Sequence, residues 1–271
     1  MALIQMNYVS AALQRAVPVQ VILPVDKFGF DGKLPPKKKF KTLYLLHGYL
    51  GNCTDWVSGT RIQRWAEERD LCVVMPSGDN AFYVDRPATG NCYGEFIGRE
   101  LVEVTRRMFP LSSKREDTFI GGLSMGGFGA MRNGLKYHDT FGAIISFSGV
   151  LELFRNWGEA PGNLDFSFQE GLFGDYDSAA ESDKNPIWLA KKLAGKKNLP
   201  DIYIACGVDD MLLSQSRNFR DLLVENGYRV TYEEGPGAHE WDFWDTYIKK
   251  VLDWLPLDAS AKGINSGNVT P

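Results

Sequence analysis

Short runs of apolar and β-branched residues recur along the chain and predict the strands of a sheet. Several of these runs are apolar at every position, which is typical of strands covered on both faces in a parallel sheet. The runs are Val19–Leu23, Thr42–Leu46, Leu71–Met75, Thr118–Ile120, Ala143–Phe147, Ile202–Ala205 and Arg229–Tyr232. We expect the segments around Tyr8 and Val21 to pair as an antiparallel hairpin at one edge of the sheet.

Segments with apolar residues at intervals of three and four alternate with these strands and predict helices. They are Arg61–Arg69, Gly98–Phe109, Met125–Tyr137, Ser214–Glu225 and Trp241–Trp254. Pro110 ends the second helix, and the Asn226-Gly227 pair ends the fourth with a left-handed cap signal. Alternation of this kind predicts a mostly parallel, doubly wound α/β sheet in one domain over residues 1–257.

Residues 150–186 interrupt this alternation. The region is rich in Phe, Trp, Gly and Asp, has weak periodicity and follows directly on a predicted strand. It therefore leaves the sheet at the carboxyl edge of the strands, where open α/β sheets bind ligands. We expect a small cap insertion that helps to roof a pocket, although a surface excursion that buries its own aromatic rings fits the same pattern. Residues 258–271 are small and polar, and predict a frayed tail.

The segment Thr118–Gly127 joins a predicted strand to a predicted helix and carries the most specific chemical signal. Within it, Gly122, Ser124 and Gly126 have the G-x-S-x-G spacing of a nucleophile elbow, in which serine occupies a tight strand-to-helix turn. Both glycines are expected to lack side chains because the strand and the helix nearly touch there. The helix N-terminus directs free N–H groups at a reacting oxygen. An ordinary serine in a glycine-rich turn fits the motif alone, so the rest of the chain must supply the remaining groups.

A nucleophilic serine needs a base, and the chain offers three histidines. His138 falls at the end of the helix that follows the elbow, where a cation suits the helix dipole, so we expect it to be structural. His47 ends a predicted strand and precedes Gly48. His239 lies in the loop between the last strand and the last helix, from which it can reach across the sheet edge. We expect His239 to be the base.

The acid is expected between the serine and the histidine, because enzymes with this elbow order their triad Ser, then Asp or Glu, then His. Asp209 and Asp210 directly follow a predicted strand and are the strongest candidates. Either one also fits the N-cap of the next helix, so one can cap that helix while the other orients His239. Weaker candidates in the cap region, which no strand precedes, are Asp175, Asp177 and Asp183.

The intermediate of acyl transfer also needs N–H donors for its oxyanion. The N–H of Met125, directly after Ser124, is one of them. The second is expected from the loop that follows the strand ending at His47, where His-Gly-Tyr-Leu-Gly brings N–H groups to the sheet edge. We expect the N–H of Tyr49 to be this donor, with that of Leu50 as the alternative.

The composition limits the classes of binding partner and the cellular compartment that we expect for this protein. A formal net charge of −4 gives no reason to expect nucleic acid or an anionic membrane as a partner. No segment approaches the roughly 18 apolar residues of a membrane span, and the N-terminus does not resemble a signal peptide. Four cysteines without C-x-x-C spacing are expected to be reduced, with Cys72 and Cys206 buried, so we expect a cytoplasmic protein. Metalloprotease, P-loop and complete dinucleotide motifs are absent, and neither a metal nor a cofactor is expected.

Four motifs follow one another in order along the chain. They are Leu46-His47-Gly48-Tyr49-Leu50-Gly51-Asn52, Gly122-Leu123-Ser124-Met125-Gly126-Gly127, Cys206-Gly207-Val208-Asp209-Asp210 and Gly237-Ala238-His239-Glu240-Trp241. Together they resemble the esterase D group of α/β-hydrolases, and are most similar to the tributyrin esterases of Gram-positive bacteria. The resemblance extends to about Leu255 and implies an α/β-hydrolase fold and an esterase that acts on short acyl chains. It also implies that the acid is Asp210 rather than Asp209.

These observations predict a serine carboxylesterase that hydrolyses small-molecule esters with short acyl chains. A feruloyl (cinnamoyl) or carbohydrate acetyl esterase is the alternative, because aromatic side chains could stack on a phenolic acid or a sugar. An S-formylglutathione hydrolase fits less well, because the loop after His47 departs from the pattern of those enzymes. Residues expected to contact the substrate are Leu50, Phe154, Trp157 and Trp241. The natural acyl and alcohol groups, and whether the chain forms a homo-oligomer, stay open.

A binding module built on a hydrolase fold is the alternative outside enzymes. Such a protein is expected to have lost a member of the triad, whereas this chain keeps a candidate at every position.

Overall fold

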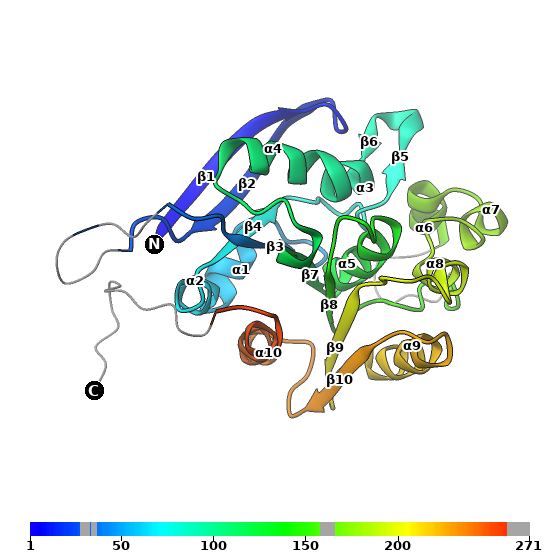
Figure 1. Cartoon of the computed structure of the whole chain (residues 1–271). Helices are drawn as coiled ribbons and strands as arrows, with labels where there is room; N and C mark the ends of the chain where they lie inside the picture. The colour runs from blue at the N-terminus through cyan, green and yellow to red at the C-terminus, as the bar shows by residue number, and fades with distance from the viewer. Residues whose placement is uncertain (28–32, 34–36, 158–165, 259–271) are drawn as a thin grey trace.

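The predicted strands form one eight-stranded sheet with helices on both faces (Figure 1). The computed structural model describes residues 1–27, 33, 37–157 and 166–258 of the 271-residue chain. The strands of the sheet are β1 (Ala2–Ser10), β2 (Arg15–Leu23), β3 (Lys41–Leu46), β4 (Leu71–Pro76), β7 (Thr118–Leu123), β8 (Ala143–Phe147), β9 (Asp201–Gly207) and β10 (Val230–Gly235). Each apolar run of the sequence lies within or overlaps one of these strands.

The strand order is β1-β2-β4-β3-β7-β8-β9-β10. Neighbours from β4 to β10 are parallel, whereas β2 is antiparallel to both β1 and β4. The expected edge hairpin is confirmed, with Tyr8 opposite Val17 and Ile4 opposite Val21. Because the parallel strands share one direction, the loops that follow them emerge at the same edge of the sheet, where α/β folds bind their ligands.

Helices alternate with the parallel strands, as the sequence predicts. They are α1 (Asp55–Gly59), α2 (Ile62–Glu67), α3 (Tyr93–Glu95), α4 (Leu101–Met108), α5 (Met125–Lys136), α6 (Phe166–Phe173), α7 (Tyr176–Ala180), α8 (Pro186–Leu193), α9 (Leu213–Glu225) and α10 (Trp241–Trp254). A separate two-stranded hairpin consists of β5 (Asp85–Arg86) and β6 (Asn91–Cys92). The sequence patterns did not indicate this hairpin or the helices α1, α3, α6, α7 and α8.

The central strands bury side chains on both faces of the sheet. In β3, Leu43 and Leu45 belong to the core under α1, α2 and α10, whereas Tyr44 and Leu46 belong to the opposite core under α4 and α5. Successive side chains of a strand point to opposite faces, so a strand covered on both sides must be apolar throughout. This explains why the runs are continuous rather than alternating.

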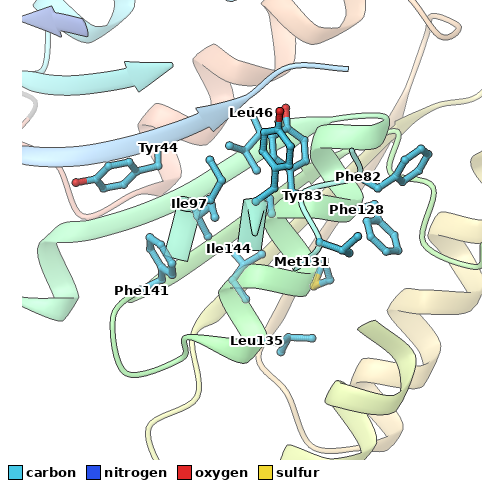
Figure 2. Close-up of a cluster of buried hydrophobic side chains, with 14 of the residues drawn as sticks. Tyr44, Leu46, Phe82, Tyr83, Ile97, Phe128, Met131, Leu135, Phe141 and Ile144 are labelled. Atoms are coloured by element: carbon cyan, nitrogen blue, oxygen red, sulfur yellow. The ribbon is translucent and has the colours of Figure 1, made fainter. Parts of the chain in front are cut away.

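The core on the α5 face is the larger of the two and is rich in aromatic residues. Figure 2 shows Phe82, Phe128 and Tyr83 beside Leu46 of the sheet, with Met131 and Leu135 of α5 below them. The Phe82 and Phe128 rings meet edge-on, with their centroids 5.6 Å apart. Through this packing, the helix that starts at the elbow is held firmly against the sheet.

The helix predicted from Gly98 begins differently from the prediction. A π-helical turn, Phe96–Glu100, precedes the regular α4. Glu100 ends this turn and accepts hydrogen bonds from the Ser10 hydroxyl at 2.6 Å and the Ala11 N–H at 2.7 Å. The wide turn thus ends on a carboxylate that anchors the helix to the β1–β2 hairpin, a constraint that helical periodicity does not reveal.

The region expected to form a cap contains α6 and α7, and α8 begins where that region ends. Residues 158–165 of the region lie outside the described residues, as do residues 259–271 of the expected tail. Within the described ranges, no helix is long and apolar enough to span a bilayer.

Candidate active site

Ser124 occupies a strained turn between the end of β7 and the start of α5. Its backbone has φ 53° and ψ −117°, a conformation that L-residues rarely adopt. Its N–H donates to the Phe147 carbonyl at 2.9 Å, which ties the turn to the neighbouring strand β8. A Cβ on Gly122 would overlap the Gly126 carbonyl, and one on Gly126 would come within 2.5 Å of the Leu46 oxygen. The expectation that both glycines lack side chains for steric reasons is therefore confirmed.

His239 and Asp210 meet above the sheet edge, although 29 residues separate them in sequence. Nδ1 of His239 lies 3.0 Å from one carboxylate oxygen of Asp210 and 3.2 Å from the other. The Asp210 side chain is fully buried, whereas a quarter of the His239 side chain is exposed. Because Nδ1 is bonded to the acid, the imidazole is oriented and Nε2 is left to accept a proton. His239 and Ser124 line the same pocket.

The two adjacent aspartates, Asp209 and Asp210, have different environments in the structure. Asp209 is exposed, and its N–H donates to the Gly237 carbonyl at 3.1 Å. Asp210 points inward, and its Oδ1 also accepts the Leu212 N–H at 2.8 Å. One residue thus both caps the turn before α9 and contacts His239, where we had expected two residues to share these tasks.

Hydrogen bonds keep the Asp210 carboxylate ionised despite its burial. Burial alone would raise its pKa, but the contacts from His239, the Ser148 hydroxyl and the Leu212 N–H outweigh burial and lower it. The acid therefore carries its negative charge throughout the neutral range and can stabilise an imidazolium on His239.

Trp244 and Ser148 support the His–Asp pair, and sequence reasoning missed both. Nε1 of Trp244 donates to the Ser148 hydroxyl at 3.2 Å, and Ser148 in turn contacts Asp210. The Trp244 ring stands perpendicular to the His239 ring, with 5.0 Å between centroids. A single indole on α10 thus touches the histidine and, through Ser148, the acid. The only available signal was the position of Ser148 directly after a predicted strand.

His47 is buried and holds the loop that follows β3. Its Nδ1 lies 2.7 Å from the Gly48 carbonyl, and its Nε2 accepts the Gly78 N–H at 2.8 Å. Nδ1 therefore carries the proton and the ring is neutral, and burial lowers its pKa. With both nitrogens engaged, His47 is not placed to take a proton from Ser124. His138 lies beyond the C-terminus of α5, at the opposite end of the helix from Ser124.

Lowering the pH below about 6.5 is expected to reduce the free energy of unfolding through His47. Because its pKa is lowered in the folded state, the unfolded chain binds a proton that the folded chain does not, and stability falls with pH. One such site can contribute up to about 1.4 kcal/mol per pH unit. Urea unfolding at about pH 7.5 and pH 5.5 measures the loss, which should be smaller in His47→Gln and unchanged in His138→Gln. Equal losses in all three proteins would contradict this role.

The loop Gly48–Gly51 brings backbone N–H groups beside Ser124. The Leu50 N–H donates to Oδ1 of Asn80 at 2.8 Å, and the Gly51 N–H donates to the Gly48 carbonyl at 3.2 Å. The alternative donor of the sequence prediction, Leu50, is therefore already engaged. Among the described residues, no acceptor binds the Tyr49 N–H. Met125 is the first residue of α5, so its N–H has no carbonyl one turn earlier to bond.

The pocket at Ser124 has a volume of about 300 Å³. It is lined by Gly48, Tyr49, Leu50, Gly51, Asp55, Leu123, Ser124, His239, Trp241 and Trp244. Leu50 and Trp241 thus lie where we expected contacts with the substrate. Leu50 is 80% exposed at the rim, and Trp241 stands edge-on to Trp56 with 5.7 Å between ring centroids.

The other two expected contact residues pack elsewhere. The rings of Phe154 and Trp157 stack on each other at 5.4 Å, and Phe173 meets both of them. Neither ring is among the described residues that line the pocket at Ser124. Large aromatic side chains in a short insertion bury one another, and for this pair the alternative of a self-packed excursion describes the structure better.

A larger cavity of about 670 Å³ lies at the opposite edge of the sheet. It is lined by residues at the amino ends of four parallel strands, among them Phe119, Ala143 and Val230. Two of its four charged residues, Arg229 and Asp201, pair with each other at 2.7 Å. Ligands of α/β sheets bind at the carboxyl edge, so the smaller pocket at Ser124 is the candidate site. Within the described residues, no cluster of His, Cys, Asp or Glu side chains is placed to hold a metal ion.

Comparisons with known proteins agree with this geometry. The model of the Esterase family matches residues 10–255. An acetyl esterase of Caldicellulosiruptor saccharolyticus is 42% identical over 269 residues, which cover 94% of this chain and 98% of that protein. Two solved Staphylococcus aureus structures each cover 94% of this chain and 98% of their own. One is the fluorophosphonate-binding serine hydrolase FphF (33% identity, TM-score 0.83), and the other is the S-formylglutathione hydrolase FrmB (35% identity, TM-score 0.81).

The sheet, its helices and the serine elbow define an α/β-hydrolase fold. The chain belongs to the Esterase family. It is a serine carboxylic-ester hydrolase, as the reading of the motifs predicted.

Proposed function

We propose that the protein hydrolyses carboxylic esters with short acyl chains through Ser124, His239 and Asp210. The observation that carries the proposal is the contact between His239 and the buried Asp210, because His239 shares one pocket with a serine on a strained elbow. A base oriented by an acid, beside a nucleophile held in a costly backbone conformation, is the arrangement that activates a serine.

The proposed reaction runs in two halves. His239 takes the proton of Ser124 as Oγ attacks the ester carbonyl, and Asp210 stabilises the imidazolium that forms. The N–H groups of Tyr49 and Met125 bind the oxyanion, and each such donor is worth about 3 kcal/mol of barrier. The C–O bond breaks, and His239 gives its proton to the departing alcohol. Water then attacks the acyl-enzyme by the same route, which returns the acid product and free Ser124.

The size of the pocket supports a short acyl group. Its apolar walls include Leu123, Trp241 and Trp244 within a volume of about 300 Å³. Trp241 is held edge-on against Trp244 at 5.1 Å, and its ring lies so close to Gly59 that a Cβ there would overlap it. Because this wall is tightly packed, moving its side chains to admit a longer acyl chain would cost free energy. The likeness to an acetyl esterase and the resemblance to tributyrin esterases support the same range of acyl lengths.

Hydrolysis of p-nitrophenyl esters from acetate to decanoate tests the proposal. We expect kcat/KM to peak at about two to four acyl carbons, because longer chains meet the tryptophan wall. The Ser124→Ala variant, assayed on every ester, measures the rate that does not depend on the site. A flat profile that the variant shares would contradict the proposal.

Two further substrates separate the alternatives. A preference of about tenfold or more for methyl ferulate over the short esters would favour a feruloyl esterase instead. We expect no such preference, since Phe154 and Trp157 pack within the cap region. Faster hydrolysis of S-formylglutathione than of p-nitrophenyl acetate would favour the activity for which FrmB is named. The cytoplasmic location stays a prediction from the pattern of the cysteines.

A further inference from the structure

The two outermost strands of the eight-stranded sheet differ in their charge. β10 forms one edge, and its Glu233 binds Lys250 at 2.7 Å. The next residue of that strand, Glu234, binds Arg217 at 2.6 Å. β1 forms the other edge (Figure 1), and its nine residues, Ala2–Ser10, include neither a charged residue nor a proline. Charges and prolines are the devices that keep an edge strand from pairing with another chain, and of these two edges only β1 lacks both.

The outer backbone edge of β1 has no strand beside it in the described parts of the chain. On its inner side, β1 pairs with β2 along its whole length, from Ala2 opposite Leu23 to Ser10 opposite Arg15. The N–H and C=O groups that point away from β2 are therefore open to a further strand. A strand of nine residues is about 30 Å long, so it offers an extended row of such groups.

Other contacts hold this edge in place. The Ser10 hydroxyl at the end of β1 donates to Glu100 at 2.6 Å. Met6 is buried in the core under α4 and α5, and Tyr8 packs against the same core. Because the strand is already ordered, a partner that pairs with it does not have to offset the cost of ordering it.

The side chains on the opposite face of β1 are exposed, and their pattern is symmetric about Met6. They are Leu3, Gln5, Asn7 and Val9. The two apolar residues stand at the ends, where Leu3 is 45% and Val9 is 78% exposed. The two amides stand between them, one on each side of Met6.

A second copy of the chain fits this pattern. A two-fold axis places identical strands antiparallel, and an axis at Met6 pairs all nine residues of both strands. In this register Leu3 lies opposite the partner's Val9, so that two exposed apolar side chains cover each other. Gln5 lies opposite the partner's Asn7, and amides can pair in this way because each one both donates and accepts.

We infer that β1 is a self-association surface through which two copies of this chain pair, edge to edge, into one continuous sheet. Because the strand carries no charge, the two-fold axis brings no like charges together within it. An extended segment of another protein would gain the same backbone bonds, but the match of apolar with apolar and amide with amide belongs to a second copy. β1 contributes no residue to the Ser124 pocket, so the inference does not depend on the proposed reaction.

Sedimentation velocity of the wild type over a wide range of concentrations is the first measurement. We expect a shift from the mass of one chain to that of two, with a dissociation constant on the order of 10 µM, because one pair of strands is a small interface. The Gln5→Glu/Asn7→Glu variant sets two pairs of like charges opposite each other across the axis. Its dissociation constant should rise about tenfold or more. Val9→Lys, which adds the charge typical of protected edges, should weaken the dimer independently.

Gln5→Lys/Asn7→Glu tests the register. It changes the same two positions but sets opposite charges against each other, so the dimer should return. In a register shifted by two residues, position 5 would lie opposite itself and the two lysines would repel. Lys196→Gln/Lys197→Gln is the matched control, because it changes the net charge by as much as Gln5→Glu/Asn7→Glu, at exposed residues after α8. It should dimerise like the wild type. Thermal melts check that every variant is folded.

Four results would overturn the inference. The wild type could stay monomeric at every concentration, which would leave the edge to a different partner. The dimer could be unchanged in Gln5→Glu/Asn7→Glu, it could weaken equally in the lysine control, or it could fail to return in Gln5→Lys/Asn7→Glu.

Discussion

Replacing Ser124 by alanine is expected to lower kcat for p-nitrophenyl butyrate by about five to six orders of magnitude. The variant would lose the proposed nucleophile and keep the proposed oxyanion donors. The same variant should lose covalent labelling by a fluorophosphonate probe, because that reagent reacts with an activated serine. Folding should be preserved, since alanine can keep the backbone of the elbow and removes only one oxygen.

Ser214→Ala is the matched control, since Ser214 is exposed on α9 and does not line the pocket. It should label and turn over like the wild type. Persistent labelling in Ser124→Ala would assign the nucleophile to another residue. Absence of labelling in the wild type would instead favour a binding module that keeps the hydrolase fold.

The sequence predicted those parts of the structure that follow from local patterns. Continuous apolar runs indicated the buried strands, and the spacing of Gly122, Ser124 and Gly126 indicated the elbow, because steric contact between β7 and α5 leaves no room for a Cβ. The positions of the loops after the strands could also be predicted, because parallel strands bring these loops to one edge of the sheet. Residues on those loops, including Asp210 and His239, could therefore be expected near Ser124.

The supporting contacts could not be predicted, because they depend on residues far apart in the sequence. Ser148 meets Trp244 across 96 residues, and Asn80 meets Leu50 across 30. Neither pair has a spacing that helical or strand periodicity would indicate. From the residues alone, the choice between Asp209 and Asp210 is of the same kind, since only the direction of the loop after β9 decides which carboxylate turns inward. The preference for Asp210 came from the family resemblance.

Ion pairs between the cap region and α5 are a second feature that local sequence patterns could not predict. Asp183, a weaker candidate for the acid, instead binds Arg132 of α5 at 3.0 Å. Arg132 is fully buried and also contacts Asp85 at 3.3 Å, and Lys136 reaches both aspartates. Burial alone would raise the pKa of Asp183, but Arg132 and Lys136 lower it, so the charges neutralise one another. In the sequence, an aspartate that belongs to an ion-pair network between this region and α5 cannot be distinguished from a candidate catalytic acid.

Asp210→Asn is expected to lower kcat by about four orders of magnitude with little change in KM, whereas Asp209→Asn should stay within about threefold of the wild type. The two substitutions are chemically identical and fall on adjacent residues, so they differ only in what the side chains touch. An amide at position 210 can donate to Nδ1 of His239, which favours the tautomer with the proton on Nε2. That tautomer cannot accept a proton from Ser124.

Folding has to be separated from catalysis in this comparison, because Asp210 also caps the turn before α9 through the Leu212 N–H. The carboxamide oxygen of asparagine can keep that bond, so the melting temperature should fall by only a few degrees. Steady-state kinetics on p-nitrophenyl butyrate and thermal melts of both variants provide the measurement. A large loss of kcat in Asp209→Asn, with Asp210→Asn nearly unaffected, would move the acid to Asp209. In that case the buried contact between Asp210 and His239 would have only a structural role.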